Sequence, residues 1–274
     1  MTTLLVQLSD LHIREPGRLA YGRIETAPYL GRAIDSILRL PQQPHAVVIT
    51  GDLTDFGRAA EYQHLRELLA PLPMPVYLMP GNHDDREQLR RSFADHPYLG
   101  QSGLVQFSIS VAGLQLIAMD TVVTGASAGS LCTEQLVWLA DELKMHASKP
   151  VIVAMHHPPF QTLIGHMDDI GLLQGAAELE ALIGQYPNVE RIICGHLHRA
   201  IQVRFGGTIA ATVPSPAHQV CLDLAPDAAS MWSLEPPGFG LHALPAGGRL
   251  VSHTLASGHF DGPFPFHDGD QLID

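Results

Sequence analysis

Two pairs of histidines stand directly after two strongly apolar runs of this chain. His156 and His157 follow the first run, in "VAMHHPPF", and His196 and His198 follow the second, in "CGHLHRA". An imidazole is costly to bury unless both of its ring nitrogens find partners, so packing alone does not account for two such pairs. The histidines therefore indicate a chemical role.

Further polar residues occupy the same kind of position after other apolar runs. They are Asp10 and His12 after the first run, Asp52 after the second, and Asn82, His83 and Asp84 after the third. Open α/β sheets gather ligands at the carboxyl ends of their strands, so we expect the five clusters to meet in one crevice. Imidazole, carboxylate and amide ligands from separate loops suit a binuclear metal site, in which one carboxylate bridges two cations.

Any one of these residues alone would have a more ordinary explanation. An Asp at a strand end commonly caps the turn that follows it, and a single buried His is usually a core residue with satisfied nitrogens. Their combination in five clusters favours metal binding over both explanations.

Short β-branched runs alternate with amphipathic stretches between these clusters. The pattern predicts strands at residues 3–9, 45–50, 76–80, 150–157 and 189–196, and helices at 29–40, 61–70, 133–146 and 176–186. The apolar face of the first helix consists of Leu30, Ala33, Ile34, Ile37 and Leu38. This alternation is typical of βαβ units, so we expect an α/β fold with buried parallel strands. Residues 105–120 alternate around Ala112 and Gly113 like a hairpin, which indicates a second sheet packed on the first.

The sequence changes in character after about residue 200, where short strand-like runs with frequent Pro and Gly replace the helical pattern. We expect a core at residues 1–200, and at residues 201–274 strands that complete the core together with a small β-rich cap or oligomerisation region. This segment has too few regular elements to bury its large apolar residues by itself, which are Trp232, Phe239, Phe260, Phe264 and Phe266.

The composition is that of a globular chain. Its 274 residues are 46% hydrophobic and carry a net charge of −12. A nucleic-acid polymer or an anionic membrane attracts clustered Lys and Arg, so this charge argues against binding to either. The N-terminus lacks the basic segment and cleavage site of a signal peptide, and no apolar run reaches membrane-spanning length, so we expect a cytoplasmic protein. The three cysteines, Cys132, Cys194 and Cys221, have no metal-type spacing, and an odd number argues against a disulfide framework.

Five short motifs resemble the sequence blocks of the calcineurin-like metallophosphoesterase family: "SDLH", "GDLTD", "GNHDD", "MHHPP" and "GHLH". They occur in family order across residues 9–198, and the resemblance implies the metallophosphoesterase fold, a four-layer α/β/β/α sandwich. The runs "LAYGR" and "GRAAEYQHL" are similar to one branch, the class III cyclic-nucleotide phosphodiesterases and bacterial glycerophosphodiesterases. The runs "PAHQV" and "HTLASGHFDGPF" resemble the glycerophosphodiesterases.

The resemblance implies two divalent metal ions per subunit. On its motifs, Asp10, His12 and His198 would hold the first ion, Asn82, His156 and His196 would hold the second, and Asp52 would bridge the two. Purple acid phosphatases have an iron-binding tyrosine where this chain has Asp55, so we expect divalent ions only. Ligands of these types accept manganese, iron, zinc or cobalt. The resemblance gives His157 no metal.

The reaction that the resemblance implies is hydrolysis of a small phosphodiester, of the glycerophosphodiester type, by in-line attack of a metal-bridging hydroxide. His83 would stabilise the developing charge or protonate the leaving alkoxide, and His218 would lie on the substrate side. Asp84, the next residue after His83, is placed to fix the tautomer of that histidine. A 3′,5′-cyclic nucleotide is the close alternative substrate, and a phosphomonoester or a phosphoprotein is a more distant one.

Other classes of protein fit less well. A nuclease would need a basic groove, and a scaffold that had lost catalysis would lack ligands, whereas all seven are present. Similar enzymes use their C-terminal region to pair subunits and to wall the active site. We therefore predict a homodimer or higher homo-oligomer in which the C-terminal segment joins subunits and restricts the pocket to small diesters.

Overall fold

The computed structural model describes residues 2–273, which form two β-sheets packed face to face between helices. The first sheet has the strand order β15–β14–β1–β2–β3, in which β1, β2 and β3 are parallel and β14 runs antiparallel to both of its neighbours, β1 and β15. Its strands are β1 (Thr3–Leu8), β2 (Ala46–Thr50), β3 (Val76–Met79), β14 (Gly238–Leu244) and β15 (Val251–Ala256).

The second sheet has the strand order β10–β11–β9–β7–β5–β4, with β5, β7, β9 and β11 parallel. Its strands are β4 (Phe107–Val111), β5 (Leu114–Met119), β7 (Val151–Met155), β9 (Val189–Cys194), β10 (Gln202–Phe205) and β11 (Thr208–Thr212). The hairpin predicted for residues 105–120 is the β4–β5 pair. Its turn residues Ala112 and Gly113 have φ values of +47° and +95°, the left-handed backbone that a tight hairpin requires.

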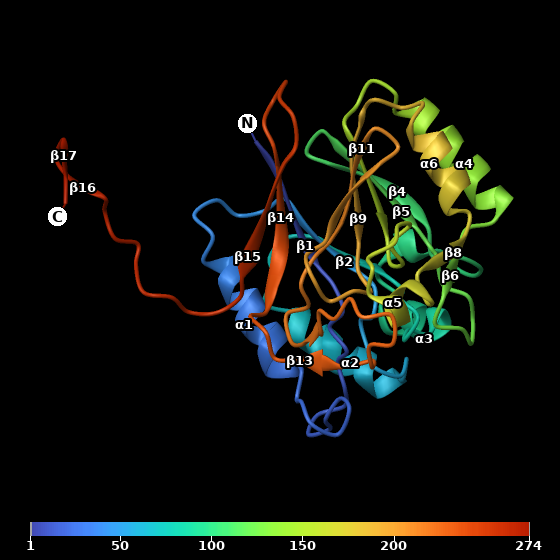
Figure 1. The fold of residues 1–274 in the computed structure, drawn as a ribbon, viewed down its shortest axis with the longest axis horizontal. Helices are drawn as coiled ribbons and strands as arrows, with labels where there is room; N and C mark the ends of the chain where they lie inside the picture. Colours follow the sequence, from blue (N-terminus) through green and yellow to red (C-terminus); the bar gives the residue numbers. More distant parts are fainter. Residues whose placement is uncertain (1, 274) are drawn as a thin grey trace.

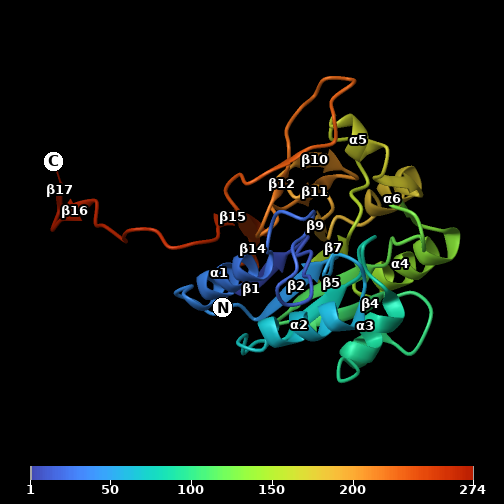
Figure 2. The same ribbon diagram turned by 90° about the horizontal axis from the view of Figure 1, so that it is seen from below.

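Helices cover the outer face of each sheet, and Figure 2 shows the two groups on opposite sides of the strands. Leu30, Leu65 and Leu89, from the three helices of the first group, pack in one apolar cluster with residues of β1 and β2. Leu139 and Leu179, from the second group, pack in another cluster with residues of β7 and β9. The first group is α1 (Ala27–Leu38), α2 (Ala59–Leu69) and α3 (Arg86–Ser92), and the second is α4 (Thr133–Met145) and α6 (Ala176–Ile183).

A third apolar cluster lies between the two sheets, with residues of β1, β2, β5, β7 and β9. The order of layers is therefore helix, sheet, sheet, helix, which confirms the predicted four-layer α/β/β/α sandwich (Figure 1). The amphipathic face predicted for the first helix is also confirmed, because Leu30, Ala33, Ile34 and Ile37 are buried and Leu38 is half-buried.

Strands that follow residue 200 belong to both sheets. β10 and β11 extend the second sheet beyond β9, while β14 lies beside β1 in the first. The remaining elements are short, namely η1 (Pro97–Leu99), α5 (Gly165–Asp168), β6 (Gly129–Ser130), β8 (Leu172–Gln174), β12 (Gln219–Val220), β13 (Trp232–Ser233), β16 (His267–Asp268) and β17 (Gln271–Leu272). No helix among residues 2–273 is long and apolar enough to cross a membrane.

The chain ends in an arm that runs away from the sandwich, as both ribbon views show (Figure 1, Figure 2). The arm leaves the body at Gly258, whose carbonyl accepts a hydrogen bond from Arg39 at 2.8 Å. Beyond that point β16 and β17 pair with each other. Phe239 is fully buried in the body and Trp232 is half-buried, whereas Phe260, Phe264 and Phe266 on the arm are 64%, 76% and 82% exposed in this single chain.

Candidate metal centre

The loops that follow β1 and β2 run side by side, and this pairing positions the first ligands. Asp10 N donates to the carbonyl of Gly51 at 3.0 Å, and His12 N donates to the carbonyl of Asp52 at 3.0 Å. The loop after β9 joins them from the other sheet, because His196 N donates to Asp10 Oδ1 at 2.8 Å. The predicted crevice at the carboxyl ends of the strands is therefore where the two sheets meet.

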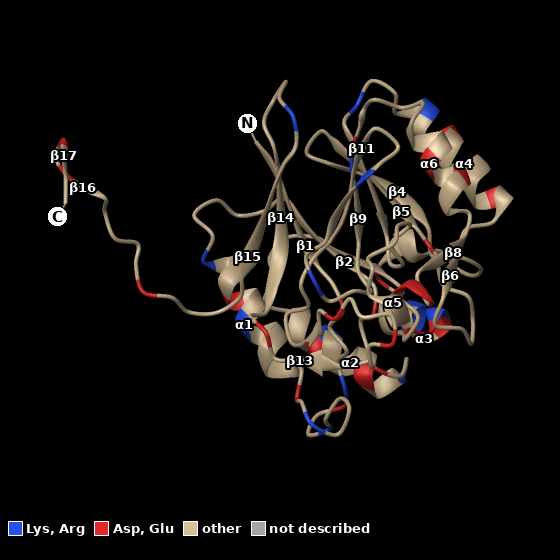
Figure 3. Ribbon diagram, in the orientation of Figure 1, with Lys and Arg blue, Asp and Glu red and all other residues tan. Residues whose placement is uncertain are grey.

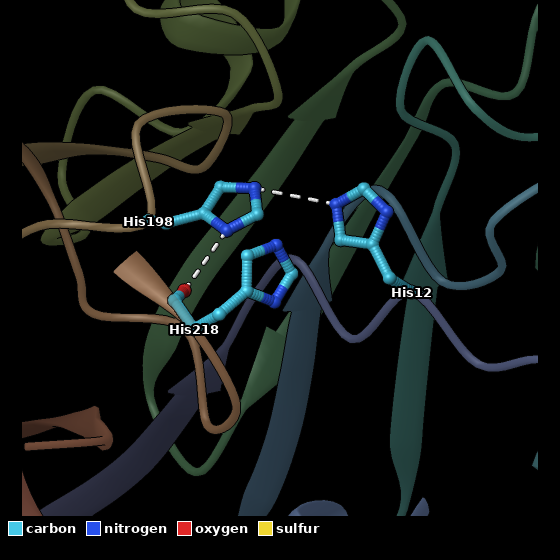
Figure 4. A group of neighbouring side chains, drawn as sticks. All are labelled: His12, His198 and His218. Atoms are coloured by element: carbon cyan, nitrogen blue, oxygen red, sulfur yellow. Dashed lines mark hydrogen bonds between the residues drawn. The ribbon is translucent and has the colours of Figure 1, made fainter. Parts of the chain in front are cut away.

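One half of the site is formed by Asp10, His12, Asp52 and His198, whose ligand atoms lie within 4.8 Å of one another. His12 Nε2 and His198 Nε2 face each other at 3.2 Å, as Figure 4 shows. Asp10 Oδ1 lies 3.7 Å from His198 Nε2, and Asp52 Oδ2 lies 3.5 Å from His12 Nε2. These four side chains can surround one cation.

The other half of the site is formed around the amide of Asn82. Its Oδ1 lies 3.1 Å from His156 Nε2 and 3.1 Å from His196 Nδ1. Asp52 Oδ1 lies 3.4 Å from the same His156 nitrogen. One oxygen of Asp52 thus faces each half, which is the arrangement a bridging carboxylate needs.

Three of the four histidines that are predicted ligands form a hydrogen bond through the ring nitrogen that faces away from the site. His12 Nδ1 bonds to Asp55 Oδ1 at 3.1 Å, His156 Nδ1 to the Thr50 carbonyl at 2.8 Å, and His198 Nδ1 to the His218 carbonyl at 3.0 Å. Each of these acceptors fixes the proton on the rear nitrogen and leaves Nε2 free to bind a metal.

The backbone at the ligands is held in an unusual conformation. Five of the seven predicted ligands have positive φ, namely Asp10, His12, Asp52, His196 and His198, with values from +45° to +71°. For a residue with a side chain this region costs about 1–2 kcal/mol, and such residues concentrate at functional sites. A close approach accompanies the strain: a side chain at Gly81 would collide with the Asp52 carboxylate and the His156 ring.

The donor set fits divalent cations. Asp10 and Asp52 are buried, and among residues 2–273 their ion contacts are with histidines and not with Lys or Arg. The buried Asp10 Oδ2 has no hydrogen-bond partner in the part of the chain that the structure describes.

The neighbouring histidines keep Asp52 ionised. Burial raises the pKa of Asp52, but the charges of His156, His83 and His12 outweigh the effect of burial and hold this pKa well below its ordinary value. Burial likewise lowers the pKa of His156, yet the Asp52 charge raises it to about 9. A carboxylate that stays ionised in this way attracts a cation.

The predicted partnership of His83 and Asp84 is wrong. His83 Nδ1 bonds to the carbonyl of Asp55 at 2.8 Å, which fixes its tautomer. The Asp84 carboxylate instead accepts hydrogen bonds from Leu53 N at 3.0 Å, Gly81 N at 2.9 Å and the Tyr62 hydroxyl at 2.9 Å. Asp84 therefore ties the loop after β3 to the loop after β2, and burial, with the nearby Asp52 charge, raises its pKa to about 6.

His218 lies beside the first half of the site. Its ring centroid is 4.5 Å from that of His198, its Nε2 is 3.3 Å from the Tyr21 hydroxyl, and burial lowers its pKa (Figure 4). A second contribution, which the sequence did not indicate, is its carbonyl, which holds His198.

Two further residues near the site were not assigned a role in advance. The sequence motif distinguishes Asp55 only as the replacement of a tyrosine, but its carboxylate joins His12 to Arg14, whose Nη1 lies 3.2 Å from Asp55 Oδ2. His157 accepts from or donates to Thr121 Oγ1 at 2.8 Å through Nδ1, and its Nε2 is 3.1 Å from the Ser127 carbonyl. Since a carbonyl can only accept, Nε2 carries the proton, and burial lowers the pKa of His157 to about 3. The position of His157 next to the predicted ligand His156 is only a weak sequence signal for these hydrogen bonds.

A cavity of ≈ 220 Å³ opens over the two halves. Its floor includes His12, Asp52, Asn82, His196 and His198, and its walls include His83, Tyr21, His218, Trp232, Met167 and Met231. The Tyr21 and Trp232 rings lie 5.6 Å apart, so one side of the cavity is aromatic.

Comparisons with known proteins agree with this geometry. The family model described as calcineurin-like phosphoesterase matches residues 3–200. The chain is 37% identical over 272 residues to a probable glycerophosphodiester phosphodiesterase of Arcobacter nitrofigilis, covering 99% of this chain and 100% of the relative. It is 34% identical over 271 residues to a probable cyclic nucleotide phosphodiesterase of Rhodopseudomonas palustris, covering 97% of each. Among solved structures, a dimetal phosphatase from Danio rerio shares the fold with a TM-score of 0.63 at 16% identity, over 93% of this chain and 99% of that one.

Proposed function

This chain belongs to the calcineurin-like phosphoesterase family and is a phosphoric diester hydrolase, and we propose that it hydrolyses small glycerophosphodiesters at a centre of two divalent metal ions. The observation that carries the proposal is the placement of Asp52, with one oxygen 3.5 Å from His12 Nε2 and the other 3.4 Å from His156 Nε2. When bound, two divalent ions supply positive charge for the phosphoryl oxygens and a nucleophile from water of lowered pKa.

The residues of the chain would hold these ions as the sequence implied. Asp10, His12 and His198 would hold one ion, Asn82, His156 and His196 would hold the other, and Asp52 would touch both. A neutral amide is a weaker ligand than a carboxylate, so the half of the site with Asn82 would bind its ion less tightly. Manganese, iron, zinc and cobalt all suit these ligands.

His83 is the group that we assign to the leaving oxygen. It lines the cavity, and its ring lies 4.6 Å from that of His12. The Asp55 carbonyl holds the proton at Nδ1, so in the imidazolium form of His83 the second proton is on Nε2, from which it would pass to the leaving alkoxide and leave the neutral ring. His218, with the Tyr21 hydroxyl beside it, would contact the substrate from the opposite wall.

The size of the cavity favours a small diester over a polymer. Ligand pockets commonly span about 300–1,000 Å³, and this cavity of ≈ 220 Å³ is below that range. The relative from Arcobacter nitrofigilis, named a probable glycerophosphodiester phosphodiesterase, matches this chain over its full length. A 3′,5′-cyclic nucleotide is the second candidate, because the Tyr21 and Trp232 rings at 5.6 Å offer an aromatic wall for a base.

We also propose that the C-terminal arm joins subunits. Three phenylalanines on it, Phe260, Phe264 and Phe266, are exposed in the single chain, and clustered exposed apolar residues mark interaction surfaces. Light scattering of the full chain and of a chain that ends at residue 257 tests this: the full chain should be a dimer or larger, and the shortened chain should be smaller. A monomeric full chain would contradict it.

A substrate panel with measured metal content tests the function. Chelated protein should be inactive and should regain hydrolysis of bis(p-nitrophenyl) phosphate with Mn(II) or Co(II). Glycerophosphoethanolamine, 3′,5′-cyclic AMP and glycerol 3-phosphate should then be compared by kcat/KM on the reloaded enzyme. Activity that survives complete metal removal would refute the metal centre, whereas a preference for cyclic AMP would refute only the glycerophosphodiester assignment.

A further inference from the structure

A second concave region lies near the amino end of β9, whereas the metal ligands follow the carboxyl end of the same strand. It is a groove of ≈ 700 Å³, and its lining includes Glu190, Arg191, Arg204, Thr208, Arg249 and Leu250. The chain has only 16 Lys and Arg against 28 Asp and Glu, so three arginines around one groove stand out from an acidic background. Figure 3 shows basic residues beside β11 and at the β14–β15 hairpin, in the upper part of the view.

Arg191 is the unusual member of this set. It is only 9% exposed, and its buried Nε has no hydrogen-bond partner among residues 2–273. Within that range the side chain of Arg191 makes no hydrogen bond or ion pair, and the same holds for the side chains of Arg204 and Arg249, which are exposed. Burial lowers the pKa of Arg191, and the neighbouring Glu190 raises it in part. A guanidinium nitrogen that is buried without a hydrogen-bond partner destabilises the folded state, so an arginine kept in this position favours a bound anion.

The sheet register brings a second arginine to the same side. Ile192 on β9 lies opposite Ala210 on β11, so the preceding residues, Arg191 and Ile209, are neighbours on the other face. Ile209 in turn lies opposite Arg204 on β10. Arg191 and Arg204 are therefore two strands apart on one face, about 10 Å between their backbones. Arginine side chains are long enough to meet across that distance.

The facing sheet completes the groove. Arg249 precedes β15 in the hairpin from β14, and the next residue, Leu250, donates its N–H to Glu190 Oε2 at 3.1 Å. One carboxylate oxygen of Glu190 thus accepts a hydrogen bond from the backbone of the hairpin, and this bond joins the two sheets beside Arg191. The three arginines that line the groove thus come from β9, from β10 and from the hairpin.

We propose that this arginine groove, formed by Arg191, Arg204 and Arg249, is a binding site for a small phosphate-bearing anion, separate from the metal centre. Arginine presents a planar fork of N–H donors that matches phosphate oxygens, and such charge-assisted bonds are about twice as strong as neutral ones. The anion supplies the partner that Arg191 lacks. Glu190 limits the net charge of the groove to +2, which suits a dianionic phosphate group.

Calorimetric titration of inorganic phosphate into the metal-loaded protein, at constant ionic strength set with chloride, tests the proposal. The wild type should bind phosphate at two sites, one of which competes with substrate at the metal centre. Arg204→Gln should weaken the second site about tenfold or more, the loss of one charge-assisted contact, and Arg191→Met should abolish it. Arg91→Gln, an exposed arginine on α3, is the matched control and should change neither site.

Thermal unfolding gives an independent measurement. Arg191→Met removes an unpaired buried charge, so without phosphate its Tm should equal or exceed that of the wild type, while its gain in Tm on adding phosphate should be smaller. A single phosphate site in the wild type, or equal phosphate affinity in wild type and Arg204→Gln, would overturn the proposal. Ribose 5-phosphate then separates a free phosphate from a phosphate ester, because only an ester also contacts the apolar lining of Val203 and Ile209.

Discussion

Replacement of Asp55 by asparagine tests how this chain holds one of its two proposed metal ions. Asp55 Oδ1 lies 3.1 Å from His12 Nδ1, and Oδ2 lies 3.2 Å from Arg14 Nη1. A carboxylate accepts through both oxygens, whereas the amide of asparagine has one acceptor. The substitution keeps the shape of the side chain, but either His12 or Arg14 must lose its hydrogen bond, and His12 loses the neighbouring negative charge in both cases.

The expected magnitude follows from the position of Asp55 behind a ligand. Loss of a carboxylate behind a metal-binding histidine typically weakens metal affinity 10–100-fold, or about 1.4–2.8 kcal/mol. The ion that we assign to Asn82, His156 and His196 should keep its affinity, because the ring of His156 forms its hydrogen bond with the carbonyl of Thr50 and not with Asp55. One of two ions should therefore become labile.

Equilibrium dialysis against graded free Mn(II), followed by elemental analysis, measures this directly. The wild type should show two bound ions per chain at concentrations where Asp55→Asn retains one. Asp95→Asn is the control, because Asp95 is an exposed carboxylate paired with Arg66 at 2.7 Å. Equal weakening of both ions, or unchanged binding of both, would refute the role given to Asp55.

Four further predictions concern other positions. Asp52→Ala should lose more bound metal than Asn82→Ala, because Asp52 faces both halves of the site and Asn82 only one; equal losses by elemental analysis would remove Asp52 from the bridging position. His83→Ala should keep its metal but lose kcat by about 10²–10⁴-fold, most for diesters with high-pKa leaving groups, and a loss that is the same for all leaving groups would exclude proton donation. His157→Gln should raise KM more than it lowers kcat at unchanged metal content, because it loosens the loop that carries Ser127 into the cavity wall; an unchanged KM would argue against this. Burial lowers the pKa of His242 to about 3 in the folded chain, whereas its pKa in the unfolded chain is about 6.5. As the pH falls below about 6.5, His242 is therefore protonated in the unfolded chain and stays neutral in the folded chain. The folded state should lose about 2 kcal/mol between about pH 7.5 and pH 5 from this group, and urea unfolding of His242→Gln should show an acid-induced loss smaller by that amount.

Local sequence patterns predicted the parts of the fold that depend on local interactions. The apolar periods located β1, α1, β2, α2 and β3, since one buried face in a strand or helix repeats every two or about 3.6 residues. The ends of those strands then placed the histidines and carboxylates in one crevice. The pairing of strands that are distant in sequence has no such local signal. β14 lies beside β1 with Leu244 opposite Thr3, and no sequence pattern near either residue specifies that partner.

Adjacency in sequence misled the prediction for Asp84. Its position next to His83 made it a plausible partner, but the two side chains leave the loop in different directions. His83 Nδ1 bonds to the carbonyl of Asp55, and the Asp84 carboxylate points toward the loop after β2, where it accepts hydrogen bonds from Leu53 N and from Thr54 N at 3.2 Å.

The C-terminal arm is a different case. Its phenylalanines indicate in the sequence that an apolar surface must be covered, but they carry no information on what covers it.

The strained backbone and the buried carboxylates of the metal centre have a common consequence for stability. The positive φ values of five predicted ligands cost on the order of 5–10 kcal/mol together, which is comparable with the whole stability of a domain. Hydrogen bonds between the ligand loops offset part of this cost, as those from Asp10 N to Gly51 and from His12 N to Asp52 show. Asp10 and Asp52 remain buried without Lys or Arg partners in the described chain, and cations are what would offset that charge. Because a ligand that binds only the folded state stabilises it, we expect bound cations to raise the stability of the folded protein through the loops that carry the predicted ligands.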